Sequence, residues 1–154
     1  MSTHRPEPPR PIVGQAARSP MLVGSFATGD AGQVTLLLPP SSEFVPLARL
    51  VAESIGNTAG FGSNDIQGLL SAVDEACGLI IDHRPRSALG LTFGPMRGRE
   101  LDVEVSSARA VDHSAPVGYG VDVLNATTQQ WSWGDDGERI VVRFVISEAA
   151  QCPR

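Results

Sequence analysis

Several residues whose side chains can do chemistry gather on one face of a segment near the middle of the chain. The segment is NDIQGLLSAVDEACGLIIDH, residues 64–83. At about 100° per residue along a helix, Glu75 and Asp82 point away from the apolar stripe. Leu79 flanks these two acids, and His83 falls in the last turn. Carboxylates and imidazoles are common proton-transfer groups in enzymes. A solvated helix face with one stray leucine explains the same pattern without any chemistry.

Two further features could contribute to a site. Gly118 and Gly120 flank a tyrosine just before a helical segment, where glycines let a backbone approach a phosphate group. The same spacing often marks only a turn. Asp-His pairs at 82–83 and 112–113 could meet around a metal ion, but neither pair has the spacing of a known metal site. The sequence therefore assigns no metal ligand.

Hydrophobic periodicity indicates the elements that must position these residues. The central segment repeats apolar side chains at i, i+3, i+4 and i+7, which predicts a helix over 64–83. Further helices are expected at 41–56 and 121–130, and strands at 32–40, 88–96, 100–107, 131–133 and 139–147. The last four strands form two predicted hairpins. The fold class is therefore α/β (α+β): a two-layer sandwich in which about three helices cover one face of a mixed, mostly antiparallel sheet.

Length, composition and net charge limit the class of protein to which the chain can belong. The 154 residues suggest one domain, predicted at 31–148, with a short tail at 149–154. Residues 1–30 hold five of the twelve prolines and are expected to be a disordered extension. A net charge of −5 argues against a nucleic-acid partner, because neutralising phosphates requires clustered positive charge. No apolar run is long enough for a membrane span, so a cytoplasmic location is expected.

Two compositional details refine this expectation. All twelve basic residues are arginine, which points to the biased codon usage of a bacterium with high GC content. Cys77 and Cys152 have neither disulfide nor zinc spacing. Cys77 lies on the apolar helix face and is expected to behave as a small buried hydrophobic residue.

In this order the pieces resemble the anti-sigma factor serine/threonine kinases of the RsbW and SpoIIAB type, which share the Bergerat fold with gyrase and sensor histidine kinases. LLSAVDEACGLIIDH is similar to the family's LRLAVDEACTNAI.H. VGYGVDVLNATTQQWSW resembles the family's glycine box and the helix after it, and GERIVVRFVIS resembles its closing strand. The likeness extends over residues 33–147.

The resemblance implies that the acidic face of the central helix is the floor of an ATP pocket. Glu75 stands at the position of the catalytic base, and the other nucleotide-binding positions are Leu79, His83, Ser106, Gly118 and Gly120. Leu79 replaces an asparagine that holds Mg²⁺, a cation that requires oxygen ligands. Ser106 stands for an aspartate that reads the adenine amino group. The loop at 107–117 is short for closing over a triphosphate. Binding of ATP and Mg²⁺ is therefore expected to be weak or absent.

The resemblance also implies a function and partners. The expected function is that of an anti-sigma-factor-like regulator of transcription, as in a stress response. Its partners would be a sigma factor, a STAS-type anti-anti-sigma protein, or both, and the protein would be a homodimer. The alternative is an active ATP- and Mg²⁺-dependent protein serine/threonine kinase, which Glu75, Gly118 and Gly120 favour. Whether the chain is an enzyme stays open at this point.

Overall fold

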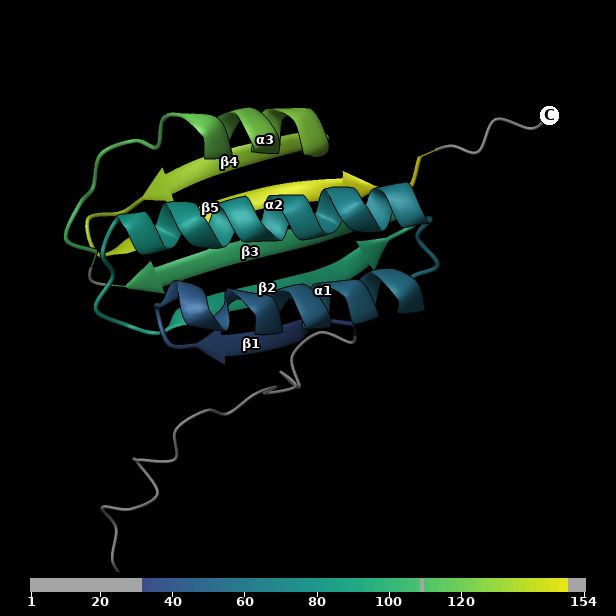
Figure 1. Cartoon of the computed structure of the whole chain (residues 1–154), viewed down its shortest axis with the longest axis horizontal. Helices are drawn as coiled ribbons and strands as arrows, with labels where there is room; N and C mark the ends of the chain where they lie inside the picture. The colour runs from purple at the N-terminus through teal and green to yellow at the C-terminus, as the bar shows by residue number, and fades with distance from the viewer. Residues whose placement is uncertain (1–31, 109, 150–154) are drawn as a thin grey trace, which may run out of the picture.

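A computed structural model describes residues 32–108 and 110–149, which form a two-layer sandwich (Figure 1). The helices, which lie on one face of the sheet, are α1 (Val45–Thr58, preceded by a 3-10 turn at Ser42–Phe44), α2 (Ser63–Asp82) and α3 (Tyr119–Thr127). The strands are β1 (Val34–Leu38), β2 (Leu89–Arg97), β3 (Glu100–Ala108), β4 (Gln130–Asp135) and β5 (Arg139–Ser147). The predicted fold class is confirmed.

The five strands form one sheet in the order β1-β2-β3-β5-β4. Each of the four pairings is antiparallel, so the sheet is antiparallel throughout rather than mixed. Both predicted hairpins are present, β2–β3 and β4–β5. The β3 and β5 strands pair along their whole length, from Glu100 opposite Ser147 to Ala108 opposite Arg139. These two central strands carry the long helix α2.

The core lies between the sheet and the helices. Leu69, Val73, Cys77 and Ile80 on α2 are fully buried, as the helical period of the segment predicts. They meet the alternating residues of β3, where Leu101, Val103 and Val105 are buried and the acids between them are partly exposed. Because the side-chain period of a strand is two, one face of β3 is packed and the other is wet.

Helix α1 packs against the core through small residues. Its fully buried residues are small, namely Ala48, Ala52 and Gly56, whereas the larger apolar residues of the same helix are only partly buried. A Cβ added at Gly56 would lie 3.1 Å from Cγ1 of Ile66. The small residues therefore let α1 and α2 lie side by side at close range over the sheet (Figure 1).

Two helix starts differ from the predictions. Helix α2 starts at Ser63, one residue before the predicted position, with Gly62 at its N-cap and no capping hydrogen bond from a side chain. Helix α3 starts at Tyr119, two residues before the predicted position, with Gly118 at its N-cap. The expected proline-rich extension and most of the expected tail lie outside the described residues.

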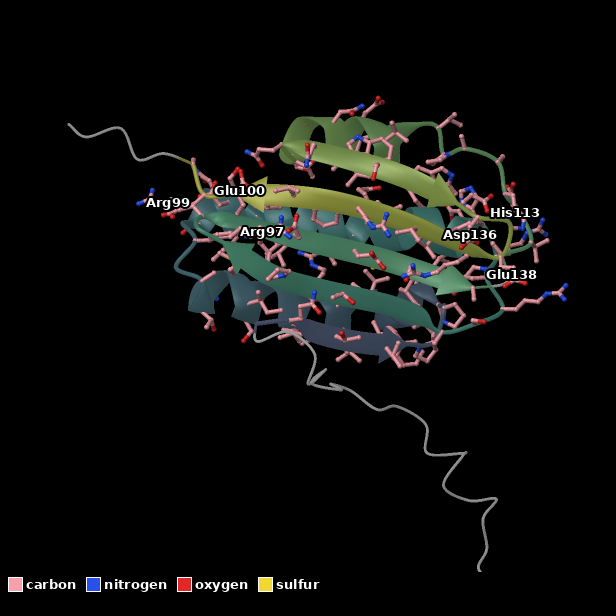
Figure 2. The ribbon with its side chains drawn as sticks, turned by 180° about the vertical axis from the view of Figure 1, so that it is seen from behind. Arg97, Arg99, Glu100, His113, Asp136 and Glu138 are labelled. Atoms are coloured by element: carbon pink, nitrogen blue, oxygen red, sulfur yellow. The ribbon has the colours of Figure 1, made fainter. Side chains whose placement is uncertain are left out.

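The face of the sheet opposite the helices is uncovered by any described element, as seen from behind in Figure 2. Charged residues gather at both ends of this view. Arg97, Arg99 and Glu100 lie around the β2–β3 turn, and His113 lies near Asp136 and Glu138 of the β4–β5 turn. No helix in the described part of the chain is long and apolar enough to span a membrane.

Candidate functional site

The site expected from the sequence lies where the N-terminus of α3 meets the outer face of α2. Glu75 is half-buried there, and its carboxylate oxygen Oε2 lies 3.0 Å from the place where a Cβ on Gly120 would stand. Burial raises the pKa of Glu75, and the nearby negative charges of Asp74 and Asp82 add to this rise. A carboxylate beside a helix N-terminus is electrostatically favoured, because the helix dipole is positive at that end.

Leu79 lies one turn further along α2 and is buried, with only 7% of its surface exposed. Its Cδ2 atom is 3.3 Å from the same position at Gly120. Leu79 therefore faces neither solvent nor an open pocket, but packs beneath the first turn of α3. Its side chain offers no oxygen to a cation, so this part of the face cannot bind Mg²⁺ through residue 79.

The two glycines at the start of α3 are required for different structural reasons. Gly118 has φ of 98°, a backbone conformation that favours glycine, and its carbonyl accepts hydrogen bonds from the amides of Val121 and Asp122. Gly120 instead permits close approach, since any side chain there would press on Glu75 and Leu79. The structure thus brings Glu75, Leu79, Gly118 and Gly120 into one region.

His83 joins this region through the loop before α3. The side chain is 5% exposed, with Nδ1 2.5 Å from the carbonyl oxygen of Leu79 and Nε2 2.7 Å from that of Ser114. Its ring centroid lies 4.6 Å from that of Trp133 on β4. Residues 110–118, which we call the lid segment, are therefore tied to the end of α2.

Ser106 is not brought to the site, and this corrects the sequence prediction. Its side chain lies on the uncovered face of the sheet, where Oγ accepts a hydrogen bond of 2.9 Å from Nη2 of Arg139. Ser107 is the residue that faces the helices, with 3% exposure and its Oγ 2.9 Å from the carbonyl oxygens of both Ser87 and Ala88. An offset of one residue along a strand exchanges the two faces.

The alternation in β3 could have identified Ser107 from the sequence. Leu101, Val103 and Val105 point into the core, so the next residue in that series is Ser107. Ser106 and Ser107 both follow the apolar strand LDVEV, and the motif alone favoured Ser106, the first of the two. The side chain of Ser106 points away from the helices, so it cannot contact a nucleotide bound between the helices and the sheet.

The two Asp-His pairs do not assemble into a common metal site. Both ring nitrogens of His83 face carbonyl oxygens, and Nδ1 of His113 lies 2.8 Å from Oδ2 of Asp135. The carboxylate of Asp112 accepts hydrogen bonds from the amide and the hydroxyl of Ser114. Within residues 32–108 and 110–149, no group of three or more histidine, cysteine or acidic residues could hold a metal ion.

The arrangement of the described elements is the Bergerat, histidine-kinase-like fold. A solved structure of the RsbU and RsbW domains of Rv1364c from Mycobacterium tuberculosis superposes on 75% of the chain with a TM-score of 0.63 at 9% sequence identity. The chain spans 32% of that protein's length, so this likeness concerns the fold of one domain.

Sequence comparison gives the closer relationship. The serine-protein kinase RsbW of Halalkalibacterium halodurans is 26% identical over 123 residues, covering 67% of this chain and 76% of that protein. The serine-protein kinase RsbW of Bacillus thuringiensis is 29% identical over 77 residues, about half of each chain (48% of both). No family model matches the sequence. The chain is thus a homologue of the RsbW serine-protein kinases, which confirms the resemblance seen in its sequence.

Proposed function

We propose that this chain is an anti-sigma-factor-like regulator that binds a sigma factor, a STAS-type anti-anti-sigma protein, or both, and that its ATP-dependent kinase activity is weak or absent. The homology to RsbW proteins supports the class of regulator. One observation carries the second part: the first turn of α3 rests directly on Glu75 and Leu79, with 3.3 Å between Cδ2 of Leu79 and a Cβ placed on Gly120.

The residues of the site do not fit Mg-ATP. The family's Mg²⁺ ligand is replaced by Leu79, a buried hydrocarbon side chain, and Mg²⁺ binds oxygen ligands. The adenine-reading aspartate is replaced by Ser107 on the helix-facing side of β3, and its hydroxyl lies within hydrogen-bond distance of two carbonyl oxygens of the chain itself. These contacts support a pocket that is filled by protein atoms.

The charge of the helical layer supports a protein partner of opposite charge. Asp74, Glu75 and Asp82 lie along the outer side of α2, and a groove of about 380 Å³ between α1 and α2 is lined in part by Asp74, Asp82 and Arg49. With a net charge of −5, the chain would associate faster with a basic surface of a sigma factor. We also propose, from family likeness alone, that the protein is a homodimer.

The rival function is an active ATP- and Mg²⁺-dependent protein serine/threonine kinase. Two observations favour it: the relatives are named serine-protein kinases, and Glu75 lies beside the glycine-rich start of α3. In this case the lid segment and α3 would move away from α2 when the nucleotide binds.

Binding measurements with purified partners separate the two functions. The full chain is titrated against sigma factors and STAS-type proteins of the same organism, with and without Mg-ATP, and the STAS protein is then examined for phosphoserine. We expect binding that does not depend on the nucleotide and no phosphate transfer. Binding to none of these proteins would overturn the regulatory proposal, and rapid transfer of phosphate to serine would establish the kinase.

A further inference from the structure

His83 is held between two hydrogen-bond acceptors, which constrains its protons. Its Nδ1 lies 2.5 Å from the carbonyl oxygen of Leu79, and its Nε2 lies 2.7 Å from the carbonyl oxygen of Ser114. A carbonyl oxygen can only accept a hydrogen bond, and a neutral imidazole has one N–H group. Both contacts can therefore be hydrogen bonds only when the ring carries a proton on each nitrogen.

The surroundings of the ring suit a positive charge. The indole of Trp133 lies against it at 4.6 Å between centroids, with an interplanar angle of 37°, a separation at which an aromatic ring attracts a cation. Two hydrogen bonds from Ser114 lower the pKa of Asp112, so that a negative carboxylate stays near the ring. The charged side chains on the elements packed around His83 are Asp65, Asp74, Glu75 and Asp82 on α2, Arg84 after it, Asp112 and His113 in the lid segment, and Asp135 on β4. Six of these eight are acids.

The backbone of His83 reinforces the connection to the lid segment. Its carbonyl oxygen accepts hydrogen bonds from the backbone amides of Val111 and Asp112, with an N···O distance of 3.1 Å in each case. Losing one ring proton would leave a nitrogen lone pair facing a carbonyl oxygen in a site that is almost closed to water, where an unsatisfied polar group is costly. The lid segment ends at Gly118, the N-cap of α3, and Gly120 in the first turn of α3 lies against Glu75 and Leu79.

We propose that His83 is a proton-controlled latch: the doubly protonated ring holds the lid segment closed over the Glu75–Leu79 face, and loss of one proton releases it. The latch goes beyond the proposed function, since it requires neither a nucleotide nor a partner. It would make access to this face depend on pH.

NMR on the full chain tests the latch. Long-range ¹H–¹⁵N spectra report the protons on each ring nitrogen, and amide hydrogen exchange at Val111 and Asp112 reports opening of the lid segment. We expect both nitrogens of His83 to carry protons while the lid segment is closed. As His83 loses a proton, exchange at both amides should rise at least tenfold beyond the intrinsic effect of pH.

Two variants complete the design. The glutamine side chain in His83→Gln does not titrate, so this variant should abolish the pH-dependent opening. His113→Gln, which removes the other histidine of the lid segment and its contact with Asp135, should leave that opening in place. A His83 ring that keeps one proton throughout the folded range overturns the proposal, and this result needs only the wild-type chain. Persistence of the pH-dependent opening in His83→Gln would overturn it as well.

Discussion

Residue 79 decides whether the floor of the site can hold a cation. Leu79→Asn introduces an amide oxygen, and Ser107→Asp introduces a charged acceptor on the helix-facing side of β3. Each charged hydrogen bond contributes roughly 1.5–3 kcal/mol, so the double variant should bind Mg-ATP about two to four orders of magnitude more tightly than the wild type. The melting temperature with and without Mg-ATP measures this gain.

Position 106 supplies the matched control. Ser106→Asp adds the same charge one residue earlier, but on the uncovered face beside Arg139. Combined with Leu79→Asn, it should leave the affinity for Mg-ATP close to that of Leu79→Asn alone. Equal gains from the substitutions at 106 and 107 would mean that the side of the strand does not matter, and the assignment of Ser107 would be wrong.

Cys77 gives a prediction on pH. Burial on α2 raises the pKa of its thiol from 9.0 to about 12. A raised pKa in the folded protein contributes stability below pH 9 that is lost as pH rises from there towards 12, because only the unfolded chain releases the proton in that range. The free energy of unfolding should fall by up to about 1.4 kcal/mol per pH unit through this effect.

Denaturant titrations of the wild type and Cys77→Ala between pH 8 and pH 11 measure this contribution. The variant will be less stable at pH 8, because it loses a buried sulfur atom. Its stability should nevertheless fall less steeply with pH than that of the wild type. Parallel pH profiles would show that the thiol ionises as readily in the folded protein as in the unfolded chain.

At the scale of elements, the contact between α2 and α3 can be probed with two glycines. A Cβ added at Gly78 on α2 meets no atom within 4 Å, so Gly78→Ala should stabilise the protein by about 0.5–1 kcal/mol through helix propensity. Gly120→Ala gains the same helix propensity in α3. Its Cβ would however lie 3.0 Å from Oε2 of Glu75, so the gain should be smaller or reversed.

Chemical denaturation of both alanine variants tests this difference. If Gly120→Ala stabilises the protein as much as Gly78→Ala, then α3 does not press on α2 in solution. That result would also weaken the proposal that protein atoms fill the pocket.

The elements themselves were largely predictable because their signals are local. The helical period of residues 64–83 and the alternation of Leu101, Val103 and Val105 depend only on neighbouring residues. The burial of Leu79 was not predictable in this way. Leu79 is buried because Gly120 of α3, which is much later in the chain, packs against it. The helical period of α2 cannot show that a second helix lies on its outer face.

The site was predictable in part for the same reason. Glu75, Gly118 and Gly120 carry recognisable motifs, and the structure brings them together. The contacts of His83 could not be foreseen, since its acceptors are backbone carbonyls, which every residue has. Ser106 was chosen in place of Ser107 because the motif comparison did not consider which face of the strand each serine occupies.

Under the proposed function, two surfaces of the molecule are candidates for binding a partner. One is the acidic helical layer with its groove beside Arg49, and the other is the uncovered face of the sheet. The uncovered face carries the ion pairs of Glu104 with Arg139 and Arg143 and a cavity of about 480 Å³. A regulator that works by binding requires such surfaces but does not require a working nucleotide site.

The central claim is that this chain keeps the kinase fold without an effective nucleotide site. Isothermal titration of Mg-ATP into the full-length wild-type chain tests it most directly. We predict no saturable heat at ligand concentrations up to about 1 mM, which corresponds to a binding free energy weaker than about −4 kcal/mol. A micromolar dissociation constant that disappears when Mg²⁺ is chelated would contradict the claim and favour the active kinase.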